Sequence, residues 1–203
     1  MSIVITISRE YGAGGHSIGQ AVAKELGIPF FDRDIVKETA LESGFEKELV
    51  EREEEDATKA DTIMKGIASF TSRYFHDSQD AIHDIQKAII LRLAEQGSCV
   101  ILGRCADQIM NEAGMNCLNV FIHADDVHRA VRVSQLTGSK DATELQKMMN
   151  KKDASRHNYY THYTGKRWGD SNNYDLTLNS GKLGYELCTK LIVDAAKAKA
   201  DEE

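Results

Sequence analysis

The stretch Ser8-Arg9-Glu10-Tyr11-Gly12-Ala13-Gly14-Gly15-His16-Ser17 decides how this chain is interpreted. It follows an apolar run, residues 3–7, that has the composition of a buried strand. A helical pattern comes next, with Ile18, Val22 and Leu26 on one face. Strand, glycine-rich loop and helix in this order favour phosphate binding. Glycines let backbone N–H groups turn inward, and the helix N-terminus carries a partial positive charge.

The loop departs from the usual P-loop pattern, G-x-x-x-x-G-K-[ST]. Gly15 and Ser17 match the second glycine and the hydroxyl residue, whereas Glu10 and His16 replace the first glycine and the lysine. A histidine is mostly neutral in water at pH 7, so His16 brings less charge than a lysine. The simpler interpretation is a tight turn between strand and helix. We predict a polyphosphate site formed by Gly12, Ala13, Gly14, Gly15, His16 and Ser17.

Length and composition predict one globular domain, residues 1–203. The net charge of −7 argues against nucleic acid as a partner, and no apolar run is long enough to span a bilayer. The four cysteines form no C-x-x-C pair, and the first residues lack the features of a secretory signal. Together these observations predict a cytoplasmic protein with reduced thiols.

Five short strand candidates alternate with helical patterns, which predicts an α/β protein with three layers, α/β/α, and a five-stranded parallel sheet. The candidates are residues 3–7, 29–31, 99–102, 118–122 and 175–178. Ligands of such sheets bind beyond the carboxyl ends of the strands. The glycine loop, Asp32, Gly103-Arg104 and His123 each follow a strand directly, so we expect them to meet at one edge.

Residues 34–97 are too long for a single crossover, and their pattern is almost entirely helical. We interpret them as a helical insertion between the second and third strands. Near the end of this insertion an apolar stripe predicts a face that packs on the core. The stripe consists of Ile82, Ile85, Ile89 and Leu93.

A second unusual segment, residues 140–167, carries seven positive and three negative charges in an otherwise acidic protein. This local excess indicates a clamp over an anionic substrate; the alternative is a solvated helix with extended lysines. Just before it, Arg129 and Arg132 lie on a predicted helix that begins after Asp125-Asp126, a good N-cap pair.

The ordered motifs of the chain resemble those of the cytidylate kinase-like family, within the nucleoside monophosphate kinases of P-loop fold. The resemblance covers nearly the whole chain. The motifs are residues 8–15, Phe31-Asp32-Arg33, residues 101–104, residues 120–124, Asp153-x-x-Arg156, Tyr159-Tyr160, Thr164-Gly165-x-x-Trp168 and residues 174–180. The resemblance implies a P-loop kinase-like fold. It also implies a nucleoside-monophosphate-binding insertion at 34–97 and a mobile lid at 136–168.

The resemblance further implies roles for single residues. Gly103 and Arg104 correspond to the Gly-Arg that contacts the acceptor phosphate, although Leu102 stands where cytidylate kinases proper carry an aspartate. Asp153 and Arg156 correspond to the lid element whose arginine meets the transferring phosphate. The remaining implied residues are Arg129 and Arg132 beside the lid, His16 at the position of the catalytic lysine, Asp32 and Arg33 at the substrate, and Ser17 as a ligand of Mg²⁺.

We therefore expect ATP-dependent phosphoryl transfer to a nucleoside monophosphate, with CMP as the first candidate acceptor. The loss of the loop lysine favours an alternative, a nucleotide-binding sensor or regulatory protein without phosphotransfer. A third interpretation is a structural dimer module whose insertion binds another protein. The expected cofactors are ATP and Mg²⁺. The expected partner is a small-molecule nucleotide, with no nucleic acid and no membrane, and the chain is expected to be a monomer or homodimer.

Three further features leave alternatives open. His157 and His162, near several tyrosines, either flank a base or pack within the lid. Trp168 either stacks on a base or closes an apolar gap. Cys105 follows Arg104 closely and is expected to be partly exposed near the site.

Overall fold

The computed structural model describes residues 3–32 and 72–201. Their strands form one parallel sheet in the order β2-β3-β1-β4-β5. The strands are β1 (Val4–Arg9), β2 (Phe30–Phe31), β3 (Cys99–Leu102), β4 (Cys117–His123) and β5 (Leu176–Asn179). The five-stranded parallel sheet is thus confirmed, and each expected strand ends within two residues of the observed one.

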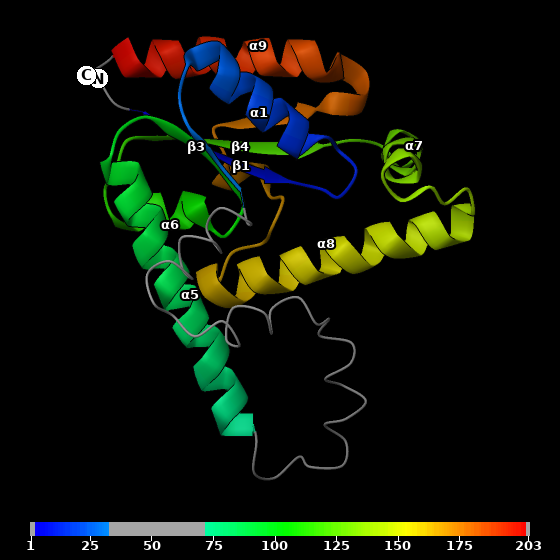
Figure 1. Ribbon diagram of the computed structural model, residues 1–203, viewed down its shortest axis with the longest axis horizontal. Helices are drawn as coiled ribbons and strands as arrows, with labels where there is room; N and C mark the ends of the chain where they lie inside the picture. The colour runs from blue at the N-terminus through cyan, green and yellow to red at the C-terminus, as the bar shows by residue number, and fades with distance from the viewer. Residues whose placement is uncertain (1–2, 33–71, 202–203) are drawn as a thin grey trace.

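Helices cover both faces of this sheet. Figure 1 shows α1 and α9 on one face, with α5 and α6 on the other, which confirms the predicted three layers. The described helices are α1 (Gly15–Leu26), α5 (Ser72–Glu95), α6 (Ala106–Glu112), α7 (Asp126–Thr137), α8 (Ala142–Thr164) and α9 (Ser180–Asp201), with a short 3₁₀ helix at Ser171–Asn173. No helix within 3–32 and 72–201 is both long and apolar enough to cross a bilayer.

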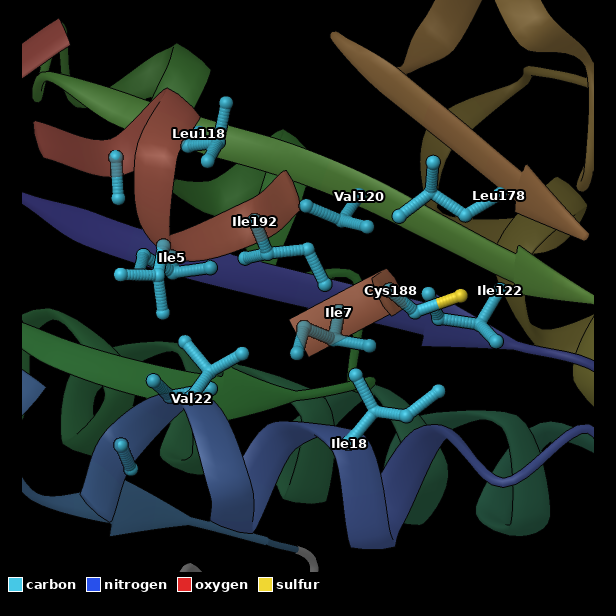
Figure 2. Close-up of a cluster of buried hydrophobic side chains, with 14 of the residues drawn as sticks. Ile5, Ile7, Ile18, Val22, Leu118, Val120, Ile122, Leu178, Cys188 and Ile192 are labelled. Atoms are coloured by element: carbon cyan, nitrogen blue, oxygen red, sulfur yellow. The ribbon is translucent and has the colours of Figure 1, made fainter. Parts of the chain in front are cut away.

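The central strand, β1, is buried on both faces. Ile5 and Ile7 are fully buried against α1 and α9, in the cluster drawn in Figure 2. Val4 lies in a second cluster on the opposite face, with Ile90 of α5 and Met110 of α6. Because both faces are covered, the strand is a continuous apolar run instead of an alternating one.

The apolar stripe at the end of the insertion is confirmed where the structure describes it. Ile89 is buried, and Ile85 and Leu93 pack against the cluster below the sheet. The side chain of Ile82 and the residues 33–71 lie outside the described part of the chain. The insertion and the lid, as functional units, therefore stay predictions.

Two capped helices follow β4. Asp125 accepts a hydrogen bond from the backbone N–H of His128, which confirms the N-cap predicted for α7. Asp141 caps α8 in the same way. The start of α8 packs on α7 through Leu145 and Met149, which enclose Val133. The 23-residue α8 then runs on as one long helix (Figure 1).

Candidate phosphate-binding site

The loop between β1 and α1 requires its glycines for two separate reasons. Gly12 and Gly14 have φ of +86° and +80°, in the left-handed region that favours glycine. A Cβ at Gly12 would also lie 2.8 Å from the carbonyl oxygen of Arg129, and one at Gly14 would overlap the ring of Tyr185. The loop is therefore sharply turned and also closely packed against α7 and α9.

A side-chain hydroxyl group also forms hydrogen bonds with this loop. Ser180, the first residue of α9, donates a hydrogen bond of 2.7 Å to the carbonyl of Ala13 and contacts the carbonyl of His123 at 3.2 Å. Gly14 caps α1 without a side-chain acceptor of its own. The first N–H groups of α1 thus keep the geometry in which helix N-termini bind anions.

The side chain that replaces the P-loop lysine is turned toward β2. His16 Nε2 lies 3.1 Å from Asp32 Oδ2, and its ring meets Phe30 edge-on at 5.2 Å between centroids. Asp32 directly follows β2, as the sequence predicted. Arg33, the other predicted residue there, lies outside the described residues. Ser17 Oγ accepts a hydrogen bond of 3.3 Å from Arg132 on α7.

Arg129 is a buried cation that ties the loop to its surroundings. Its Nε donates to the carbonyl of Tyr11 at 2.9 Å, and its guanidinium pairs with Glu10 at 3.4 Å and with Asp153. Glu10 also accepts a hydrogen bond from the backbone of Ala124. Glu10, the residue at the missing first glycine, therefore joins the loop to α7 and to the end of β4.

Asp153 and Arg156 bring α8 onto the same loop. Asp153 accepts a 2.7 Å hydrogen bond from the backbone N–H of Tyr11. Arg156 donates from Nη1 to the carbonyl of Arg9 at 2.9 Å and lies over the Tyr11 ring, 5.7 Å from its centre. The structure thus gathers the predicted lid residues at the glycine loop, about 140 positions away in sequence. Their catalytic roles stay predictions.

The loop after β3 adopts an unusual backbone. Gly103, Arg104 and Cys105 follow one another with φ of +79°, +60° and +54°. Positive φ is costly for residues that carry a side chain, and such strain clusters at functional sites. Cys105 is buried, and burial raises the pKa of its thiol to about 12. The expectation that Cys105 is partly exposed was wrong.

The far end of α8 is attached through aromatic side chains. Tyr160 donates a 2.6 Å hydrogen bond to Asp107, and burial raises the pKa of that carboxyl. Tyr163 stacks on His83 of α5 at 3.7 Å between centroids, and Arg104 lies over Tyr159. No local sequence signal predicted these contacts, because they join residues that are far apart in the chain.

Two of the remaining aromatic residues contact neighbouring elements. His162 Nε2 lies 3.6 Å from Asp80 on α5, and the choice between base contact and lid packing for His157 and His162 stays a prediction. Trp168 meets Phe121 of β4 edge-on at 5.4 Å, so it closes an apolar gap.

A cavity of about 220 Å³ opens beside the glycine loop. It lies between α7 and the start of α9, and it is lined by Gly12, His128, Arg132, Ser180, Gly181 and Tyr185. An aromatic ring and several polar groups converge there, as in sites for small organic ligands.

The donors at the loop suit Mg²⁺ better than a metal with many protein ligands. In residues 3–32 and 72–201, no three His, Cys, Asp or Glu side chains gather as a metal site. Mg²⁺ typically keeps several waters and binds through substrate phosphates, so it needs few protein oxygens. The hydroxyl of Ser17, at the start of α1, fits this kind of coordination.

Comparisons with solved structures show the same fold. A protein from Eubacterium ventriosum is 27% identical, with a TM-score of 0.73 over 97% of this chain and 99% of that one. TT1252 from Thermus thermophilus has 16% identity and a TM-score of 0.55, covering 98% and 97% of the two chains. Shikimate kinase from Bacteroides thetaiotaomicron has 16% identity and a TM-score of 0.51, covering 99% of each chain.

A comparison with curated proteins finds no match. The model of the cytidylate kinase-like family, in contrast, matches residues 4–182. This range includes β1, the glycine loop, the loop after β3, and the arginines of α7 and α8. The chain therefore belongs to the cytidylate kinase-like family, and its fold is that of the P-loop kinases.

Proposed function

We propose that the protein transfers the terminal phosphoryl group of ATP to a phosphate oxygen of a nucleoside monophosphate, giving ADP and a nucleoside diphosphate. CMP is the first acceptor to test, because of the family to which the chain belongs. The observation that carries the proposal is the convergence of three elements on one glycine loop. Arg132 of α7 contacts Ser17, Arg156 of α8 contacts the carbonyl of Arg9, and the loop after β3 lies beside them.

This arrangement suits phosphoryl transfer for a physical reason. The reaction needs aligned oxygens and positive charge around the moving group, and it needs little covalent chemistry from the protein. The backbone of residues 12–17 binds the donor phosphates, and Arg104 binds the acceptor phosphate. Arg156 and Arg132, with their permanent charges, stabilise the group in transit. Ser17 would be the protein ligand of Mg²⁺, which would supply positive charge that offsets the charge of the donor phosphates.

The cavity beside the loop supports a nucleotide as the donor. It begins at Gly12, so a group attached to phosphates in the loop reaches it directly. The ring of Tyr185 and the imidazole of His128 line its walls. Both present flat surfaces on which a base stacks. We assign this cavity to the base and sugar of ATP.

A second candidate function is favoured by one observation. His16 contacts Asp32 and Phe30, so the lysine position of the loop brings no permanent charge. A protein that binds nucleotide without transferring phosphate, as a sensor does, tolerates this loss better than an enzyme. In either case the glycine loop is the binding site.

A coupled assay of ADP release distinguishes these functions. Purified protein is incubated with ATP, Mg²⁺ and each nucleoside monophosphate in turn, with shikimate added to the panel because one structural neighbour is a shikimate kinase. Turnover with a nucleoside monophosphate supports the proposal. Saturable ATP binding in calorimetry without any turnover supports the sensor, and absence of both contradicts the two.

A further inference from the structure

The side chain of Arg9 spans the gap between the two loops of the site. A Cβ added to Gly15 would lie 2.7 Å from Arg9 Cβ and 2.8 Å from Arg9 Cγ, so the aliphatic stem rests on the first turn of α1. A Cβ added to Gly103 would overlap Arg9 Nη1, so the guanidinium rests on the loop after β3. Glycine at these two positions is what leaves room for this arginine.

The backbone around Arg9 fixes this placement. Arg9 is the last residue of β1, the central strand. Its carbonyl accepts the 2.9 Å hydrogen bond from Arg156, and the N–H of Gly103 donates to the carbonyl of Ile7 at 3.0 Å. The base of Arg9 and the loop that its guanidinium touches are therefore both tied to β1.

The position of Arg9 differs from those of His16 and Arg129, two of the groups expected to act at the glycine loop. His16 is turned to Asp32 and is half-exposed. Arg129 is buried and pairs with Glu10 and Asp153, so it holds the loop to α7 and α8. The Arg9 guanidinium lies at Gly103, where the donor loop and the Gly103-Arg104 loop meet.

From this geometry we infer that Arg9 is a further phosphate-binding cation of the site, and that at the glycine loop it supplies the permanent charge that a P-loop lysine gives elsewhere. The inference rests on the proposed function, because it assumes a polyphosphate in the loop. A guanidinium suits the task, since it stays charged and offers several N–H donors to phosphate oxygens of two groups at once. It also accounts for a loop that carries histidine in place of lysine.

The test measures ATP affinity by calorimetry, with Mg²⁺ and without acceptor, together with turnover. A hydrogen-bonded charge contributes enough that Arg9→Gln is expected to weaken ATP binding about 10- to 100-fold. Arg9→Met keeps an apolar stem on Gly15 and serves if the glutamine variant fails to fold, and it should lose affinity equally. Arg92→Gln, at an exposed position in the last turn of α5, removes the same charge elsewhere and should change nothing.

A second-site variant makes the test specific. His16→Lys in the Arg9→Gln background restores the charge from the neighbouring position, so it should recover at least half of the lost affinity on a logarithmic scale. Folded Arg9→Gln and Arg9→Met proteins that bind ATP as the wild type does would overturn the inference alone and leave the proposed function intact. A wild-type protein that binds neither ATP nor inorganic tripolyphosphate would overturn both.

Discussion

The two loops of the site follow neighbouring strands at the same edge of the sheet, but they differ in which residue types have positive φ. The loop after β1 has glycine at each of its positive-φ positions, whereas the loop after β3 places Arg104 and Cys105 there. Helix α8 contacts the first loop through Asp153 and Arg156, and it contacts the second loop and the start of α6 through Tyr159 and Tyr160. The Arg156 guanidinium is a cation that a phosphate can draw away from the carbonyl of Arg9, whereas Tyr160 is buried and hydrogen-bonded to Asp107. We therefore expect the contact of α8 through Arg156 to be exchangeable and the contact through Tyr160 to be a fixed anchor.

The largest expected effect concerns the exchangeable contact, which Arg156 makes with the glycine loop. Arg156→Ala should lower turnover about 10³-fold, at the lower end of the range for arginines that act on the moving phosphoryl group. The ATP dissociation constant should change less than roughly tenfold, because the charge acts mainly on the transition state. Steady-state kinetics and calorimetry measure the two quantities. Lys152→Ala, at an exposed position on the same helix, is the control. Normal turnover in the Arg156 variant would show that Arg156 does not act in the site.

The next effect concerns the glycine-built loop. Gly14→Ala should lower the free energy of unfolding by about 3 kcal/mol, since it adds positive-φ strain to an overlap with Tyr185. Gly27→Ala is the matched control, because Gly27 also has positive φ but no atom within 4 Å of an added Cβ. It should cost about 1 kcal/mol. Equal costs in urea denaturation would show that Tyr185 does not pack on the loop in solution.

The fixed anchor is tested through Tyr160. Tyr160→Phe removes the hydroxyl that donates to buried Asp107, which should cost roughly 1–3 kcal/mol of stability. The pKa of Asp107 is raised from its ordinary value of 3.8 by burial, so its contribution to stability falls as the pH rises from 3.8 through the raised value. The lost hydroxyl favoured the charged carboxylate, so the cost should be larger at a pH above the raised pKa of Asp107 than at pH 4.

A double variant separates this effect from simple loss of packing. In the Asp107→Asn background there is no carboxyl to titrate, so Tyr160→Phe should then cost the same free energy at both pH values. Denaturation curves of the four proteins, measured from pH 4 upward through the raised pKa of Asp107, give the comparison. A pH-dependent cost that persists in that background would place its origin in another group.

The smallest expected effect tests the backbone strain at Arg104. Arg104→Gly should be more stable than Arg104→Ala by about 1 kcal/mol, because glycine adopts φ of +60° without a Cβ clash. Both variants should lose acceptor affinity to a similar extent, since each removes the guanidinium. Thermal unfolding and acceptor titration check the two statements. Alanine that equals glycine in stability would mean that Arg104 leaves the left-handed conformation in solution.

The sequence predicted the sheet and the glycine loop because their causes are local. Buried parallel strands such as β1 are continuous apolar runs, and a loop with φ of +86° at Gly12 and +80° at Gly14 needs glycine there. The contacts of α8 with the glycine loop could be predicted only from the resemblance to the family. The pairing of Glu10 with Arg129 and of Asp107 with Tyr160 joins positions far apart in the chain, so no periodicity marks it.

The backbone of Arg104 and Cys105 escaped prediction for a different reason. Nothing in either residue type favours a left-handed conformation, and it persists because the surrounding structure imposes it. The turn of His16 toward Asp32 was equally hidden, because it depends on where β2 ends. Arg104 and His16, two residues proposed to act in the site, thus have conformations that the rest of the fold determines.

The central place of β1 has a consequence for how the protein is made. β1 leaves the ribosome before the strands that flank it, because it pairs with Cys99 of β3 and Cys117 of β4, 95 and 113 residues after Val4. At synthesis rates of about 5–20 residues per second, the apolar strand waits roughly 5–20 s for its partners. Unpaired apolar strands of this kind associate readily with other chains. We expect nascent chains that stop before β3 to aggregate unless a chaperone covers β1.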